Sequence, residues 1–307
     1  MAVTCGVAIA TTGNEKGIGK VIISHVEDLE TREPDWLVDG MIPRKGIGFV
    51  WGPSYSGKSL LVNSELTMMI ANGLPFAGHR TKQGPVIIIF GEGGDDYQVL
   101  SHARIERQVR DREALKRSLS DEDRDMYFPE ISDCDNIGVS YRTFDIPLGY
   151  HGEPTISLKA MVSGLKSIKP SLIILDTITD FSELSISNDA SANRVVQGMK
   201  YMAAELDCAI LAVAHPTYND KKMRGPQLFN KADFVWRLIP DEDKKGGVVV
   251  CEKVKRAEPF VPFSFSLEKI EFTEVGDNEQ KIEQKSVTAR IAEAPSGAEG
   301  GLRRRRL

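Results

Sequence analysis

Residues 52–59, Gly52-Pro53-Ser54-Tyr55-Ser56-Gly57-Lys58-Ser59, match the phosphate-loop pattern G-x-x-x-x-G-K-[ST] at every position. The apolar run 47–52 predicts a strand before this loop, and the apolar spacing of 60–73 predicts a helix that begins at Leu60. In this context the backbone N–H groups of the loop turn inward around phosphate oxygens, next to a helix N-terminus. We therefore expect residues 52–60 to bind ATP, with Lys58 reaching the β- and γ-phosphates and Ser59 ligating Mg²⁺.

Composition narrows the class of protein. The 307 residues are 41% hydrophobic and 27% charged, which is typical of a globular protein and excludes a collagen-like, coiled-coil or wholly disordered chain. The net charge of -5 excludes a uniformly basic nucleic-acid coat protein but leaves room for a local basic site. No secretory signal and no apolar run of membrane-spanning length is evident, and the four cysteines form no C-x-x-C pair. We expect a cytoplasmic protein with no membrane association.

The order of patterns along the chain predicts the fold class. Continuous apolar strands alternate with amphipathic helices, which indicates an α/β fold whose central, mostly parallel sheet is covered by helices on both faces. We expect an N-terminal extension over 1–35, a single ATPase domain over 36–272, and a polar, disordered tail over 273–307. That tail carries the cluster Arg303, Arg304, Arg305 and Arg306. The cluster is equally open to two interpretations, a nonspecific contact for DNA or an acidic partner, and a solubilising end.

Three polar residues stand at the ends of predicted buried strands, where open α/β sheets bind their ligands. Asp176 ends the run LIILD and is the candidate Walker B acid for Mg²⁺. Glu92 follows the strand after the phosphate-loop helix and is the candidate general base, because no glutamate follows Asp176 directly. His215 ends a third strand and is a candidate γ-phosphate sensor, with a satisfied core histidine as the alternative.

The three strand ends and the phosphate loop together resemble the RecA-type ATPases, specifically the RepA-like hexameric helicase branch. The likeness covers roughly residues 36–270. It is carried by WLVDGMIPRKGIGFVWGPSYSGKS (36–59), IIIFGEGG (87–94), LIILDT (172–177), LAVAH (211–215) and MRGPQLFNKADFVWRL (223–238), the last with Gly225 and Asp233. The resemblance implies a RecA-like core that binds ATP and Mg²⁺, with Lys58 and Ser59 at the nucleotide, Glu92 as base, Asp176 as Walker B acid and His215 as sensor.

The resemblance also implies that a basic residue late in the core reaches the ATP site of a neighbouring subunit. The run VVVCEKVKRAEPF (248–260) supplies Lys253, Lys255 and Arg256 for such a role. Strand alternation would put the two lysines on one face and Arg256 on the other, so we favour the lysines. A solvated basic edge strand is the alternative. A residue supplied in trans requires self-association, and we expect a homo-oligomeric ring or filament, a hexamer in the family's pattern.

Single-stranded DNA is the expected polymeric partner. The segment 216–231 follows the sensor strand and contains Lys221, Lys222 and Arg224, with aromatic residues close by. Basic side chains with stacking aromatics suit single-stranded DNA, and a polar surface loop is the alternative. The function expected is therefore that of an ATP-driven helicase or translocase in replication or recombination, of plasmid or phage type. A RecA-like recombinase filament, a non-translocating loader or scaffold ATPase, and more distantly an autokinase remain alternatives.

Overall fold

The computed structural model describes residues 34–91, 97–118, 136–141, 146–149, 151–182, 185–217, 222–275 and 281–291. All of these residues belong to the structural unit that begins at Pro34. The predicted N-terminal extension therefore lies almost entirely outside the described residues, as do Glu92, Lys221 and the four arginines 303–306.

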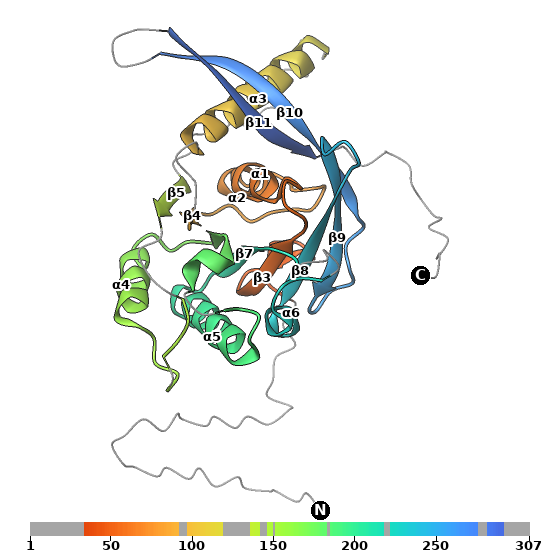
Figure 1. Ribbon diagram of the computed structural model, residues 1–307. Helices are drawn as coiled ribbons and strands as arrows, with labels where there is room; N and C mark the ends of the chain where they lie inside the picture. The colour runs from red at the N-terminus through yellow and green to blue at the C-terminus, as the bar shows by residue number, and fades with distance from the viewer. Residues whose placement is uncertain are drawn as a thin grey trace, which may run out of the picture. The chain divides into compact units, whose positions relative to one another are not determined.

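The centre of this unit is a sheet with the strand order β11-β10-β9-β8-β3-β7-β6-β4-β5 (Figure 1). The part from β8 to β5 is parallel, which confirms the predicted sheet, and β8 to β11 are antiparallel neighbours. The strands are β3 (Gly46–Trp51), β4 (Val86–Phe90), β5 (Ile137–Tyr141), β6 (Leu172–Asp176), β7 (Ala209–Ala214), β8 (Phe234–Pro240), β9 (Gly246–Val254), β10 (Phe263–Val275) and β11 (Lys281–Ile291). A small separate pair, β1 (Trp36–Val38) and β2 (Ile42–Pro43), precedes them.

Helices cover both faces of the parallel strands (Figure 1). The phosphate-loop helix runs as α1 (Lys58–Leu60), the π-helical η2 (Leu61–Leu66) and α2 (Thr67–Asn72). The remaining helices are α3 (Tyr97–Ser118), α4 (Ile156–Leu165), the 3₁₀ turn η4 (Ile178–Phe181), α5 (Asp189–Leu206) and α6 (Pro226–Lys231). Among the described residues, no helix combines the length and the apolar character needed to cross a membrane.

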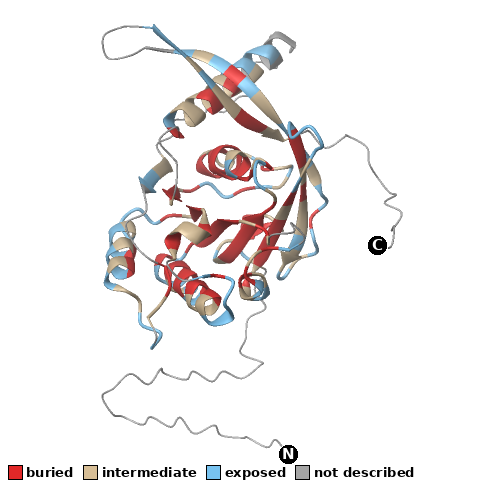
Figure 2. Ribbon diagram, viewed as in Figure 1, coloured by how far each residue is buried: buried red, intermediate tan, exposed pale blue. Residues whose placement is uncertain are grey.

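The core lies in two layers, one on each face of the sheet. Successive strand side chains point to opposite faces. In β3, Phe49 accordingly belongs to the core layer that also contains residues of α4 and α5, whereas Val50 belongs to the layer that contains the phosphate-loop helix. Figure 2 shows the inner parallel strands β3, β4, β6 and β7 buried along almost their whole length. This burial explains why a strand such as residues 86–90 is apolar at every position, because a strand covered on both faces has no side that faces solvent.

The ordered core extends past its predicted end at residue 272. Residues 263–275 and 281–291 form an antiparallel hairpin, paired in register from Phe265↔Ile291 to Val275↔Lys281. The expectation of a disordered tail from residue 273, and a core ending at 272, is therefore wrong over 273–275 and 281–291. The polar sequence was misleading because β11 has few buried apolar residues of its own. It is held by its ladder with β10 and by buried hydrogen bonds from Arg107 to Thr288 and Ala289.

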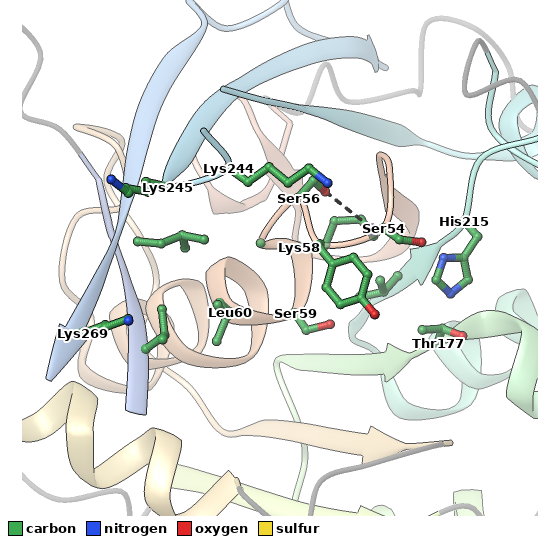
Figure 3. A pocket seen from close by; sticks show the side chains of 15 residues that line it. Ser54, Ser56, Lys58, Ser59, Leu60, Thr177, His215, Lys244, Lys245 and Lys269 are labelled. Carbon is green, nitrogen blue, oxygen red and sulfur yellow. Dashed lines mark hydrogen bonds between the residues drawn. The ribbon is translucent and has the colours of Figure 1, made fainter. Parts of the chain in front are cut away.

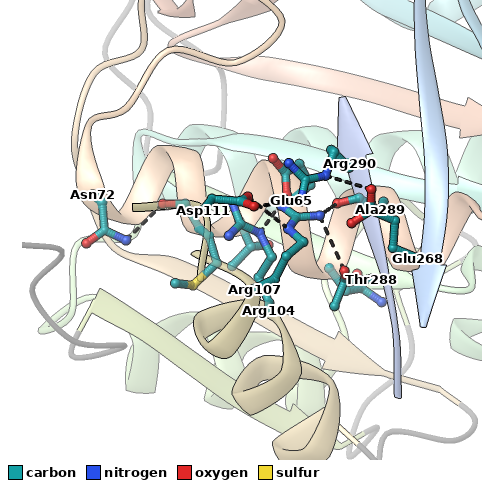
Figure 4. A network of polar contacts seen from close by, with 12 residues as sticks. Glu65, Asn72, Arg104, Arg107, Asp111, Glu268, Thr288, Ala289 and Arg290 are labelled. Atoms are coloured by element: carbon teal, nitrogen blue, oxygen red, sulfur yellow. Dashed lines mark hydrogen bonds and ion pairs between the residues drawn. The ribbon is translucent and has the colours of Figure 1, made fainter. Parts of the chain in front are cut away.

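A buried ionic cluster fastens this hairpin and α3 to the phosphate-loop helix (Figure 4). Glu65 accepts hydrogen bonds from Arg104 Nε at 2.5 Å and Arg107 Nη2 at 2.7 Å. Arg107 also donates to the carbonyl oxygen of Ala289 in β11. At the edge of the cluster, Arg290 pairs with Asp111 at 2.8 Å. The cluster ties α3 and β11, which are distant from each other in sequence, to the helix that carries Lys58.

Candidate nucleotide-binding site

A cavity of about 610 Å³ opens over the phosphate loop (Figure 3). The described residues that line it include no carboxylate but four lysines. The lining consists of Ser54, Tyr55, Ser56, Gly57, Lys58, Ser59, Leu60, Thr177, Val213, His215, Lys244, Lys245, Leu267, Lys269 and Val287. Such a lining suits a polyanion with an apolar portion, since ammonium groups favour phosphate and Leu60, Leu267 and Val287 offer apolar surface.

Two glycines of the phosphate loop occupy positions where the backbone would not accommodate a larger side chain without strain. Gly57 caps the helix at a φ of 81°, a conformation that favours glycine. At Gly52, an added Cβ would lie 2.5 Å from the carbonyl oxygen of Leu238, so a larger residue would displace β8 or the loop. Lys58 is only 6% exposed, and its Nζ donates to the carbonyl oxygens of Gly52 at 2.9 Å and Pro53 at 2.7 Å. The loop therefore holds a buried cation at its centre.

Asp176 lies at the end of β6, 6% exposed and next to the loop. The Ser59 hydroxyl hydrogen-bonds to its carboxylate, and Asn63 Nδ2 donates to its Oδ2 at 2.6 Å. Burial raises the pKa of Asp176, while these two hydrogen bonds and the charge of Lys58 act in the opposite direction. The structure thus brings together Lys58, Ser59 and Asp176, the three residues that the sequence analysis assigned to nucleotide and metal.

His215 lies at the end of β7 and lines the same cavity (Figure 3). Burial lowers its pKa, and the positive charges of Lys58 and Arg224 lower it further. The carbonyl of His215 accepts the backbone N–H of Arg224 at 3.0 Å, and Thr217 N–H donates to Lys222 O at 2.8 Å. The predicted sensor and the described part of the predicted DNA-binding segment are therefore joined by backbone hydrogen bonds.

The two residues that precede Glu92 in the chain lie beside Asp176. Phe90 pairs with Asp176 across the β4–β6 ladder, and Gly91 N–H donates to the carbonyl of Asp176 at 2.8 Å. Glu92 itself lies outside the described residues, so its role as a base stays a prediction.

Lys253, Lys255 and Arg256 do not line this chain's own cavity. Lys253 Nζ donates to the carbonyls of Phe229 and Asn230 near the end of α6, at 2.9 and 2.8 Å. Lys255 pairs with Asp233 at 2.8 Å. Strand β9 ends at Val254, so the alternation expected through Arg256 stops before Lys255. Their assignment to a neighbouring subunit's site stays a prediction.

Several cavity residues escaped the sequence analysis. Lys244 and Lys245 come from the β8–β9 turn, and Lys269 comes from β10. Figure 3 shows Lys244 extending over the phosphate loop towards Ser56. Lys244 and Lys245 follow a run of acidic residues, and Lys269 lies in a strand of alternating polar and apolar residues. Neither stretch contains a nucleotide-binding motif, so only the fold brings these lysines to the cavity. The contact between Asn63 and Asp176 spans 113 positions and was equally invisible.

The residues present fit a magnesium–nucleotide complex. Mg²⁺ is commonly bound through one or two carboxylates together with substrate phosphates, so an all-protein ligand cage is not needed. No group of three or more His, Cys, Asp or Glu side chains suited to a metal occurs among the described residues. What the site offers is one buried carboxylate, Asp176, with the hydroxyl of Ser59 against it and the ammonium of Lys58 nearby.

Similarity to one protein family agrees with this interpretation of the fold. The model of a family described as "AAA domain" matches residues 15–221. No curated protein matches the chain. Two solved structures show partial similarity, which at these values carries no functional conclusion. The RadB recombinase is 15% identical, with a TM-score of 0.43 over 72% of this chain and 86% of that chain. A KaiC-like protein from the hyperthermophilic archaeon Pyrococcus horikoshii OT3 is 11% identical, with a TM-score of 0.46 over 85% of this chain and 98% of that chain.

The family match covers more than half of the chain and includes the phosphate loop and Asp176. The sheet order, the parallel strands and the loop at the end of β3 agree with it. The chain therefore belongs to this AAA domain family, and its fold is that of a RecA-like P-loop NTPase.

Proposed function

We propose that this protein is a Mg²⁺-dependent ATPase that acts on single-stranded DNA, as a helicase or translocase of the RepA-like type. The observation that carries the nucleotide assignment is the cavity over the phosphate loop, which is lined by four lysines and no carboxylate among the described residues. Lys58 lies in its floor, and Asp176 and Ser59 are in contact beside it.

Each residue has a role that follows from its chemistry. Lys58 offsets the charge of the β- and γ-phosphates, and the loop N–H groups around it orient them. Ser59 and Asp176 would hold Mg²⁺, which when bound neutralises charge that develops on the phosphate oxygens. We assign the proton-accepting role towards the attacking water to Glu92, the residue that follows Gly91 in the chain.

Coupling to DNA is proposed to pass through His215. This side chain faces the cavity, and its own carbonyl is bonded to Arg224 in the segment that also carries Lys222. A displacement of His215 at the phosphate end would therefore move the backbone of that segment. Lys221, Lys222 and Arg224 would contact the phosphates of the DNA strand.

Self-association completes the proposal. Lys253, Lys255 and Arg256 lie away from the cavity of their own chain, as residues that serve a neighbour's site must. Lys255 would have to exchange Asp233 for a phosphate oxygen of the neighbour's nucleotide. A ring, with a hexamer as the family's pattern, or a filament would satisfy this requirement.

The test is the steady-state rate of ATP hydrolysis with and without single-stranded DNA, together with the mass of the assembly in solution. We expect stimulation by DNA and a mass of several chains. Hydrolysis without any DNA response would favour a loader or scaffold ATPase. DNA-dependent hydrolysis with strand exchange but no strand displacement would favour a recombinase.

A further inference from the structure

Asn63 is the one described side chain, besides Ser59, that hydrogen-bonds to the Asp176 carboxylate. Its Nδ2 donates to Asp176 Oδ2 at 2.6 Å. Asn63 lies four residues after Ser59 on the same helix, so the two side chains share a face and meet the carboxylate together. Neither the phosphate-loop motif nor the strand-end argument includes this residue.

The local backbone holds Asn63 in place. It lies within the π-helical segment Leu61–Leu66, and such segments are frequent at functional sites. The hydroxyl of Tyr97, the first residue of α3, donates to the carbonyl oxygen of Asn63 at 3.1 Å. The amide is therefore presented to Asp176 from a backbone position that is itself bonded to a second helix.

Packing alone does not explain an asparagine at position 63. The residue is 1% exposed, and its Oδ1 has no hydrogen-bond partner within the described part of the chain. A buried, unsatisfied amide oxygen destabilises the folded state, and an apolar residue of similar size would avoid this loss. The contact that Asn63 makes with Asp176 gives a reason for an amide at this position.

We propose that Asn63 is a positioning residue for the magnesium site, which holds one oxygen of Asp176 so that the carboxylate faces Ser59. This inference rests on the proposed function, because it concerns how Asp176 serves a magnesium–nucleotide complex. Partners that orient a metal-ligating group typically change metal affinity by about 10–100-fold when they are removed.

The test compares Asn63→Leu with Ser64→Ala. Ser64 is the neighbouring residue and is 2% exposed. Its buried hydroxyl also has no hydrogen-bond partner among the described residues, so it does not hydrogen-bond to Asp176. Binding of a fluorescent ATP analogue is measured at equilibrium in EDTA and across a titration with MgCl₂. Thermal unfolding identifies variants that fold, and Asn63→Ala replaces Asn63→Leu if the leucine variant does not.

We expect wild type and both variants to bind the nucleotide equally in EDTA. In Asn63→Leu, the Mg²⁺ concentration that half-saturates the gain in affinity should rise at least about 10-fold, whereas Ser64→Ala should follow wild type. A wild-type magnesium requirement in Asn63→Leu, or an equal shift in Ser64→Ala, would overturn the role of Asn63 and leave the proposed function standing. A wild-type protein whose nucleotide binding does not respond to Mg²⁺ would overturn both.

Discussion

Replacing Glu65 by leucine should destabilise the protein strongly, because it removes the only acid at the centre of the described ionic cluster. Arg104 and Arg107 are 1% and 4% exposed, and Glu65 bonds to both (Figure 4). Burial lowers the pKa of Arg104 to about 10, so it remains charged at neutral pH even though the attraction of Glu65 does not fully offset burial. Glu65→Leu would leave two buried guanidinium groups without this partner.

The magnitude follows from that burial. Breaking a buried ion pair by removing one partner costs about 3–5 kcal/mol. For a chain of 307 residues, about 1.6 °C of melting temperature corresponds to each kcal/mol, which gives a fall of about 5–8 °C. The double variant Glu65→Leu/Arg104→Leu also removes one of the two buried guanidinium groups that Glu65→Leu leaves without an acid. Arg107 keeps its hydrogen bonds to Thr288 and Ala289. The double variant should therefore lose about 2 kcal/mol less than the sum of the single losses.

The assay is chemical and thermal unfolding followed by circular dichroism and by the fluorescence of the buried Trp51 and Trp236. Wild type, both single variants and the double variant form one double-mutant cycle. A free energy of unfolding within about 1 kcal/mol of wild type for Glu65→Leu, or strictly additive losses in the double variant, would refute this account of the cluster.

Three further perturbations test other parts of the account. Lys253→Ala combined with Lys255→Ala should lower the rate of ATP hydrolysis while leaving nucleotide binding intact, and unchanged turnover would remove the assignment to a neighbour's site. Because the pKa of His215 is lowered in the folded state, stability should fall as the pH drops below about 6.5, where the unfolded chain takes up the proton first. His215→Gln should flatten that dependence in thermal unfolding, and a slope equal to wild type would contradict it. Gly48→Ala places a Cβ 2.3 Å from the ring of Phe234 and should lower the free energy of unfolding by about 1–3 kcal/mol in chemical denaturation. An unchanged free energy of unfolding would show that β8 shifts to accommodate the methyl group without cost.

Much of the core could be read from the sequence because its signals are local. A continuous apolar run such as β6 predicts a strand covered on both faces, and the phosphate-loop motif fixes which helix follows which strand. Because the carboxyl ends of parallel strands meet at one edge, Lys58, Asp176 and His215 could be placed together before the structure was known.

What escaped prediction depends on contacts between distant segments. Strand β11 has few buried apolar residues and is held by β10 and by buried hydrogen bonds from Arg107, so composition alone indicated disorder. The approach of Lys244 and Lys269 to the nucleotide cavity depends on how the antiparallel strands β8 to β10 fold back over the loop. The partnership of Glu65 with Arg107 joins residues 42 positions apart, on helices whose packing no motif encodes.

The most direct test of the central claim is the rate of Mg²⁺-dependent ATP hydrolysis by wild type and by Lys58→Ala, with both proteins shown to be folded by their unfolding curves. Lys58 is the buried cation in the floor of the cavity and should stabilise charge on the β- and γ-phosphates. The account predicts that wild type hydrolyses ATP and that Lys58→Ala reduces the rate to background. Wild-type turnover in a folded Lys58→Ala protein would contradict it.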